Sequence, residues 1–257
     1  MAKSPIIYLN TSDWIGYTYN PWHGCTKIGS GCRNCYALAC AKHYHGAFGH
    51  VLNADQSDWS GEIKLREKEI DKPASWKDRH CYMNSMTDMF HRSVLDRWLD
   101  RMWLAQDAAA YKSDSMLLMF TKRWARSCEE VTRLVEWVVR PSARSPMLVH
   151  SYSTQSDFDR GFPHLMATPG VQHGISFEPL LEHINIESAF AEHGLPDWLT
   201  IGCESNGNSL GRPCHESDIG LLRDTAAFHR IPCFVKQIGI DGKLVHSPDG
   251  YPQEVAW

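Results

Sequence analysis

The chain has 257 residues, of which 43% are hydrophobic and 22% are charged, and its formal net charge is −4. This length allows one large barrel or two small domains. The acidic balance argues against a protein that binds nucleic acid mainly by neutralising phosphates, although it allows a local basic patch. No apolar run reaches the roughly 18 residues that a membrane helix needs, and the N-terminus lacks a signal peptide's apolar core. We therefore expect a cytoplasmic protein with no membrane partner.

Three of the nine cysteines are clustered near the N-terminus. Cys25, Cys32 and Cys35 fall within eleven residues, in the stretch 20–36. In a reducing compartment, cysteines in odd number and irregular spacing are more often metal ligands, catalytic groups or buried thiols than disulfides. Glycines at positions 24, 29 and 31 let the loop curl so that the thiolates converge. The stretch therefore predicts a metal centre.

Three thiolates would leave one iron of a 4Fe-4S cluster without a protein ligand. S-adenosylmethionine (SAM) can chelate such an iron through its amino and carboxylate groups. One electron from the reduced cluster then cleaves SAM into methionine and a 5'-deoxyadenosyl radical, so the cofactor performs the difficult chemistry while the protein aims it.

Two other interpretations of the cysteine loop stay open. Structural zinc would need Cys40, His23 or His43 as a fourth ligand, although zinc ligands usually come in two separated pairs. A redox-active pair formed by the last two cysteines would leave the first one unexplained.

From residue 81 onward, short apolar runs alternate with longer amphipathic segments, which is typical of strand-helix units around a parallel sheet. The predicted strands are 81–83, 116–120, 147–149, 175–177, 198–201 and 233–235. One predicted helix begins at Ser93 and ends in an alanine run, and a second begins at Ser127 with a capping box. A third covers 216–229 and stops before Pro232. With no repeat or linker, we expect one domain over 1–257, with the barrel reaching about residue 240 and a C-terminal extension over 241–257.

Polar residues follow every apolar run, at 84–88, 121–123, 151–153, 178–179, 203–205 and 236–237. Barrel enzymes place their chemistry at the carboxyl ends of the strands. Six polar strand ends in register therefore predict the rim of an active site.

The cysteine motif, Asn-Pro-Trp-His-Gly-Cys-x6-Cys-x2-Cys-Tyr over 20–36, resembles that of a phage-encoded three-cysteine family of radical SAM-like proteins. The resemblance covers nearly the whole chain and includes the motifs at 84–91, 120–123, 176–180, 202–205, 212–213 and 234–237. Members of this family occur among phage genes for thymidine hypermodification. Here Cys203 stands where the family usually has glycine, Ser153 stands where it has an acidic residue, and the first two cysteines are more widely spaced than in most radical SAM proteins.

The resemblance implies an α/β fold, a partial (β/α)6 TIM-like barrel of the radical SAM superfamily. The cysteine loop would follow the first strand and SAM would lie across the strand ends. The segment 84–88 would hold the SAM amino group, and two serines would lie near its ribose. The implied cofactor-binding residues are Tyr36, Asn84, Ser85, Asp88, Ser151 and Ser153.

The implied reaction is hydrogen abstraction from an amino-acid-derived group on a modified thymine in phage DNA, followed by rearrangement or another change, as in an isomerase. Lys122, Glu178, Glu204 and Lys236 are predicted near the substrate, because lysine matches a carboxylate and glutamate an amine. An ion-pair network that only braces the barrel mouth is the alternative for these four. Cys203 could donate a hydrogen atom or could be a small buried thiol.

A base inside a duplex cannot reach a barrel's centre, so it must be flipped or single-stranded. The predicted DNA contacts at the rim are Arg92, Arg123, Trp124 and Arg126. The expected partners are DNA with modified thymine and an electron donor such as flavodoxin or ferredoxin. Two alternatives stay open: radical chemistry on a peptide or protein partner, and a non-catalytic, zinc-stabilised nucleic-acid-binding module.

Overall fold

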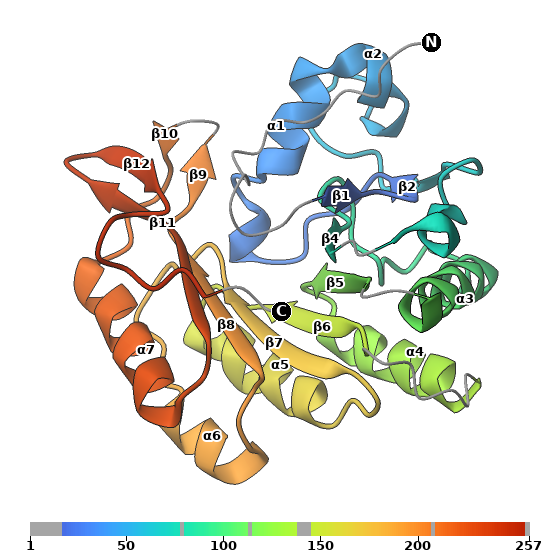
Figure 1. Ribbon diagram of the computed structural model, residues 1–257. Helices are drawn as coiled ribbons and strands as arrows, with labels where there is room; N and C mark the ends of the chain where they lie inside the picture. Colours follow the sequence, from blue (N-terminus) through green and yellow to red (C-terminus); the bar gives the residue numbers. More distant parts are fainter. Residues whose placement is uncertain (1–16, 78–79, 113–114, 138–144, 207–208, 255–257) are drawn as a thin grey trace.

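The computed structural model describes residues 17–77, 80–112, 115–137, 145–206 and 209–254, so both ends of the predicted 1–257 domain lie outside the described residues. The chain has a mixed α/β fold built on one curled sheet that forms a half-barrel (Figure 1). The coarse prediction of an α/β fold with a curled sheet is thus confirmed.

The main sheet has ten strands in the part of the chain that the structure describes. The first seven lie parallel to one another, and the last three join in antiparallel pairs. The six predicted strands are confirmed, because parallel strands covered on both faces read as continuous apolar runs. In spatial order the strands are β1 (Tyr17–Tyr19), β4 (His80–Met83), β5 (Met116–Thr121), β6 (Met147–Ser151), β7 (Gln172–Phe177), β8 (Trp198–Gly202), β11 (Cys233–Ile240), β12 (Lys243–His246), β10 (Ser209–Leu210) and β9 (Ser205–Asn206).

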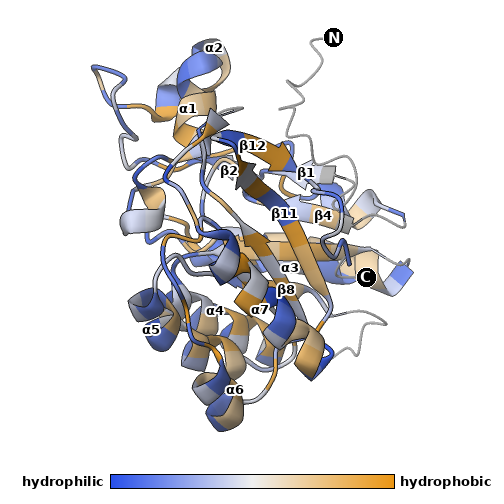
Figure 2. Ribbon diagram, turned by 90° about the vertical axis from the view of Figure 1, so that its left-hand side faces the viewer, coloured by the Kyte–Doolittle hydropathy of each residue, from blue (hydrophilic) through white to orange (hydrophobic). Residues whose placement is uncertain are grey.

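Five helices cover the outer face of the sheet (Figure 1): α3 (Asp96–Lys112), α4 (Trp124–Trp137), α5 (Gln155–Met166), α6 (Glu187–His193) and α7 (Glu216–His229). Their apolar sides pack on the strands, and polar residues face outward (Figure 2). The short helices α1 (Tyr36–His43) and α2 (His45–Phe48) lie on the opposite side, beside a small sheet of β2 (Trp22–His23) and β3 (Lys64–Leu65) (Figure 1). The described residues also form three 3-10 turns: η1 (Ser30–Cys32), η2 (Gly49–Val51) and η3 (Lys72–Ser75).

The third predicted helix is confirmed with its bounds, as α7, whereas the other two begin elsewhere. The first starts at Asp96, because the backbone N–H of Ser93 donates to His91 Nδ1 at 3.2 Å in a turn before the helix. The second starts at Trp124, so the predicted cap at Ser127 is wrong: its hydroxyl donates to the Trp124 carbonyl at 2.7 Å, inside the first turn. Helices α5 and α6 were not predicted.

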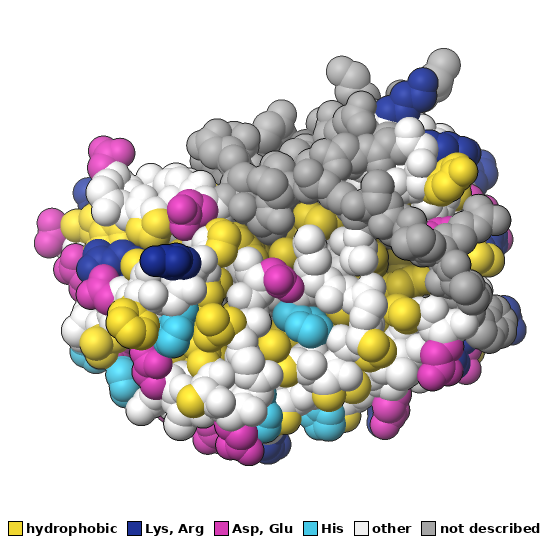
Figure 3. Space-filling view, turned by 60° about the horizontal axis from the view of Figure 1, so that its bottom comes forward, with side chains coloured by type: hydrophobic (Ala, Val, Ile, Leu, Met, Phe, Trp, Pro, Cys, Tyr) yellow, Lys and Arg dark blue, Asp and Glu magenta, His cyan; other side chains and the backbone are white. Residues whose placement is uncertain are grey.

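The stretch predicted as a C-terminal extension contains β12, which prolongs the sheet. No helix within the described residues has the length and apolar character that a membrane crossing requires. On the face formed by the outer helices, Lys and Arg side chains are scattered among Asp and Glu (Figure 3). A basic surface for DNA is therefore not found on this face.

Candidate active site at the carboxyl ends of the strands

The three clustered cysteines lie on the segment that joins β2 to α1. Cys25 follows β2 by two residues, Cys32 ends η1, and Cys35 is the residue before α1. The hydroxyl of Thr87 donates to the carbonyl oxygen of Gly24, which fastens this loop to the segment after β4. The cysteine loop therefore lies at the carboxyl ends of the first strands.

Two glycines allow the loop to approach its neighbours closely. Gly24 has a φ of +102°, and a Cβ there would lie 2.1 Å from the backbone oxygen of Glu62. A Cβ on Gly31 would lie 2.2 Å from the Oγ of Ser153. Gly29, by contrast, has open space where its Cβ would be. Glycine is thus required at two of the three positions noted in the sequence.

Cys25, Cys32, Cys35 and Cys40 are free thiols. Burial raises the pKa of the Cys25 thiol, and the Asp88 carboxylate raises it further. Burial also raises the pKa of Cys35, and the other clustered thiols are close enough to add to both shifts. Because metal ligation needs thiolates, metal loading of this loop would release protons. Among the described residues, no group of three or more His, Cys, Asp or Glu side chains is already arranged to hold a metal ion.

The segment after β4 is held by its own side chains. Asp88 accepts hydrogen bonds from the Thr121 hydroxyl at 2.8 Å and from the backbone N–H of Lys122 at 3.1 Å, so it joins the ends of β4 and β5. Ser85 Oγ accepts from Asn20. Asn84 differs, because its side-chain amide is buried and neither polar atom has a partner among the described residues. Within the segment predicted to bind the SAM amino group, Asn84 therefore has hydrogen-bonding capacity that the described residues do not use.

A pocket opens beside the cysteine loop, with about 700 Å³ of empty space including its open mouth. It brings together nine of the predicted site residues, including all five predicted catalytic ones. Sequence reasoning missed Asn34, Tyr82, Phe120 and Ser176 as lining residues, whereas Ser205 lies in the polar stretch 203–205 predicted at the rim. The remaining lining residues are Gly31, Cys32, Cys35, Tyr36, Lys122, Ser151, Glu178, Pro179, Cys203, Glu204 and Lys236.

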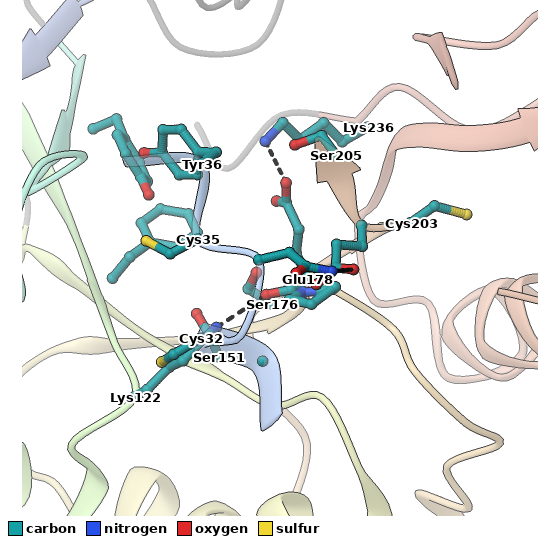
Figure 4. Close-up of a pocket in the computed structure, with 16 residues that line it drawn as sticks. Cys32, Cys35, Tyr36, Lys122, Ser151, Ser176, Glu178, Cys203, Ser205 and Lys236 are labelled. Atoms are coloured by element: carbon teal, nitrogen blue, oxygen red, sulfur yellow. Dashed lines mark hydrogen bonds and ion pairs between the residues drawn. The ribbon is translucent and has the colours of Figure 1, made fainter. Parts of the chain in front are cut away.

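A charged group at the end of β7 faces this pocket (Figure 4). The Glu178 carboxylate pairs with Lys236 Nζ at 2.5 Å, and Gln237 donates to the same oxygen at 3.3 Å. Lys122 Nζ donates to the Glu178 carbonyl at 3.0 Å. The second carboxylate oxygen of Glu178 accepts no hydrogen bond from the described residues. The pocket therefore presents two lysines and one carboxylate oxygen, and Lys236 is already paired with Glu178.

The opposite wall is aromatic. Tyr82 and Phe120 pack edge to face with ring centroids 4.5 Å apart. Tyr36 donates to the backbone oxygen of Ser85 at 2.8 Å and hydrogen-bonds to Tyr82. Burial raises the pKa of both tyrosines, so both phenols stay neutral. Tyr82 and Phe120 were missed because their apolar runs predict buried strands without indicating which side chains reach a cavity.

Cys203 and Glu204, which follow β8, already take part in a disulfide and an ion pair, respectively. The structure joins Cys203 to Cys214 in a disulfide, which the sequence argument against disulfides did not anticipate. In this state Cys203 has no thiol hydrogen to donate, and its sulfur points away from the Glu178 ion pair (Figure 4). The Glu204 carboxylate is 3% exposed and pairs with Arg212 at 2.5 Å, so it is not free to bind a substrate amine.

The two serines after β6 occupy different environments. Ser151 lines the pocket, and its carbonyl accepts from the indole N–H of Trp124 at 3.1 Å. Ser153 is 1% exposed, its hydroxyl faces Gly31, and it has no hydrogen-bond partner among the described residues. Only Ser151 can therefore contact a ligand in this pocket without a shift of the loop.

Most of the predicted DNA-contacting residues have internal partners. The guanidinium of Arg123 donates to the backbone oxygen and the hydroxyl of Thr26, at 3.2 and 2.8 Å. Arg126 donates to the carbonyls of His91 and Val94. Arg92 is exposed and remains available at the rim. The donors of Arg123 are directed at the cysteine loop, and those of Arg126 at the segment between β4 and α3, while the DNA contact of both residues stays a prediction.

A comparison with protein families matches residues 10–247 to a family described as "Protein of unknown function (DUF5131)". No curated protein and no solved structure matches the chain.

Proposed function

Because the chain belongs to the DUF5131 family of unknown function, its activity follows from its own site, and we propose that it is a radical SAM enzyme. Cys25, Cys32 and Cys35 would hold a 4Fe-4S cluster. The observation that carries the proposal is the position of these free thiols on one loop, with Cys32 and Cys35 lining a pocket at the ends of parallel strands. Three thiolates suit a cluster that keeps one iron for a small ligand.

The fold supports the same proposal. Parallel strands follow one another in sequence order and alternate with outer helices, from β4 to β11. This arrangement supports our proposal that the sheet is a partial (β/α)6 barrel of the radical SAM type, with the chemistry at the carboxyl ends of the strands.

The pocket's own side chains would orient the reactants. A bound, reduced cluster would supply the electron that cleaves SAM and generates a 5'-deoxyadenosyl radical. The wall of Tyr36, Tyr82 and Phe120 keeps water from one side of the pocket. Lys122 and Glu178 face the ligand with opposite charges, which suits the carboxylate and amine of an amino-acid group. As polar contacts for SAM we propose Ser151, which lines the pocket, and Asn84, whose side chain has no partner among the described residues, in place of Asp88.

We propose as substrate a thymine with an amino-acid-derived group in phage DNA, rearranged in an isomerase-type reaction in the host cytoplasm. Electrons would come from flavodoxin or ferredoxin. The charged and aromatic lining of the pocket supports a modified base, which must be flipped or single-stranded to enter. Since Arg92 is the exposed member of the three predicted DNA-contacting arginines, DNA affinity should be modest and salt-sensitive.

A zinc-stabilised module is the second candidate, and one observation favours it. Cys40 is a free thiol one turn into α1, and its pKa is raised by burial and by the nearby Cys35 thiol. A four-thiol set would suit structural zinc better than a SAM-binding cluster.

Anaerobic purification and turnover separate these proposals. We expect a brown protein with about four irons per chain, which forms 5'-deoxyadenosine when given SAM and a reductant. Replacing any of the three clustered cysteines by Ala should abolish both the iron content and the formation of 5'-deoxyadenosine. Cys128→Ala on α4 is the matched control and should preserve both. Colourless protein with one zinc, lost in Cys40→Ala as well, would overturn the radical SAM proposal.

The substrate needs its own comparison, with a modified DNA oligonucleotide, the matching mononucleotide and a peptide under anaerobic turnover. Consumption of the oligonucleotide alone is expected. Equal processing of the mononucleotide, or turnover of the peptide only, would overturn the DNA substrate and leave the radical chemistry in place.

A further inference from the structure

A buried ion pair joins the segment after β8 to the cysteine loop. Glu204 Oε2 accepts from the backbone N–H of Arg212 at 2.9 Å, from Arg212 Nε at 2.9 Å and from Asn34 Nδ2 at 2.8 Å. Its Oε1 accepts from Arg212 Nη2 at 2.5 Å. Such a charge-assisted, forked arrangement is both strong and geometrically specific.

The partners of this ion pair lie at both ends of the segment that contains two of the cysteines. Asn34 precedes Cys35 directly, and Arg212 Nη2 also donates to the carbonyl of Ser30, two residues before Cys32, at 2.8 Å. These contacts span 170 and 182 residues of sequence. One carboxylate and one guanidinium thus hold the segment 30–35 at its two ends.

The segment that carries the ion pair is itself constrained. The Cys203–Cys214 disulfide encloses both Glu204 and Arg212 in a short loop. A Cβ on Gly211 would lie 2.7 Å from Glu204 Oε2, so glycine there lets the backbone approach the carboxylate. Burial raises the pKa of Glu204, but the hydrogen bonds from Arg212 and Asn34 outweigh it and keep the pKa below its usual value. Glu204 is therefore ionised at neutral pH.

We infer that Glu204 and Arg212 are positioning residues that hold Cys32 and Cys35 in place against the pocket. They act through Asn34 and the Ser30 carbonyl. We call the contacts of Glu204 and Arg212 with Asn34 and Ser30 the clasp. The clasp is observed in this chain, whereas its effect on a cluster rests on the proposed function.

Hydrogen exchange of the full-length, metal-free chain tests the clasp directly. Arg212→Gln and Glu204→Gln should each speed amide exchange over residues 29–36 by about tenfold or more, since each removes charge-assisted hydrogen bonds. Arg212→Lys should give an intermediate rate, because it keeps the charge and loses the fork. Arg223→Gln is the matched control, as Arg223 pairs with its neighbour Asp224 on α7. Unchanged exchange over 29–36 in the Arg212 and Glu204 variants would overturn the inference.

A second measurement covers variants that fold poorly and separates the clasp from the proposed function. The double variant Glu204→Leu with Arg212→Met leaves no unpaired buried charge, so it should fold while freeing the loop. After anaerobic iron-sulfur reconstitution, we expect this variant to bind less iron and to change the electron paramagnetic resonance signal of the reduced cluster. If the wild-type protein binds no iron but amide exchange in the loop is faster in the variants, the radical SAM proposal is overturned and the positioning role of Glu204 and Arg212 is supported. Wild-type iron loading with an unaltered signal and unaltered exchange in the variants would overturn the clasp alone.

Discussion

Mild acid should destabilise this protein through three buried histidines. Burial lowers the pKa of His23 to about 3, of His91 to about 4 and of His150 to about 3, from an ordinary value of 6.5. Each is at most 7% exposed, and each stays neutral in the folded chain at pH 5 and above. In the unfolded chain they take up protons below pH 6.5, so the unfolded state binds more protons. Stability is therefore fully present above pH 7 and falls as the pH drops from 6.5 towards the folded-state values.

The size of the effect follows from these shifts. Each buried histidine costs about 1.4 kcal/mol per pH unit below 6.5, or about 2 kcal/mol between pH 7 and pH 5. Three such groups lower the free energy of unfolding by about 6 kcal/mol, a large part of the roughly 5–15 kcal/mol that native proteins have. Two of them lie beside the cysteine loop: His23 is two residues before Cys25, and His91 Nε2 bonds to the Thr26 hydroxyl at 3.0 Å.

Urea unfolding at pH 5, 6, 7 and 8, followed by the fluorescence of the ten tryptophans, measures this dependence. His23→Phe should reduce the loss of unfolding free energy between pH 7 and pH 5 by about 2 kcal/mol, because it removes one of the three groups that take up a proton on unfolding. Phenylalanine is a suitable replacement, since the His23 ring packs on Phe48 and its Nδ1 has no partner among the described residues. His43→Gln, on an exposed residue, should leave the loss unchanged. A free energy of unfolding that stays constant from pH 7 to pH 5 would show that these histidines do not limit stability in acid.

Three further predictions concern stability around the site. Gly31→Ala should destabilise the fold by about 1–3 kcal/mol, since its Cβ would overlap Ser153 Oγ, whereas Gly29→Ala should leave the melting temperature unchanged; equal melting temperatures for the two variants would contradict this. Replacing Cys203 and Cys214 together by Ser should lower the free energy of unfolding by about 3 kcal/mol, because the disulfide restricts the unfolded chain by closing a loop of this length. A wild-type urea midpoint that dithiothreitol does not change would argue against the disulfide. Asp88→Asn should cost about 2–3 kcal/mol, because an amide cannot replace both acceptor oxygens, and an unchanged urea midpoint would show that the bonds to the end of β5 contribute nothing.

The strands and the order of the site segments could be predicted from sequence because their causes are local. Each buried parallel strand requires its own apolar run, and the polar residues after it mark its end. The same locality explains the errors at helix starts. Ser127 has the sequence signature of a cap, but its hydroxyl finds the carbonyl of Trp124 and the ring of His150, which no local pattern reveals. Helix α5 did carry a signal, since Thr154 accepts from the backbone N–H of Asp157 as an N-cap residue.

The α/β alternation, the three cysteines on one glycine-rich loop and the polar residues at the strand ends could all be recognised before the fold was known. Which of those residues keep hydrogen-bonding groups available to a ligand became clear only from the folded chain. Glu204 lines the pocket, but its carboxylate is bound by Arg212 and Asn34. One carboxylate oxygen of Glu178 has no hydrogen-bond partner within the part of the chain that the structure describes. The physical reason is that hydrogen-bond satisfaction depends on groups brought together by the fold, here across as many as 182 residues, and no spacing within a segment records such a partner.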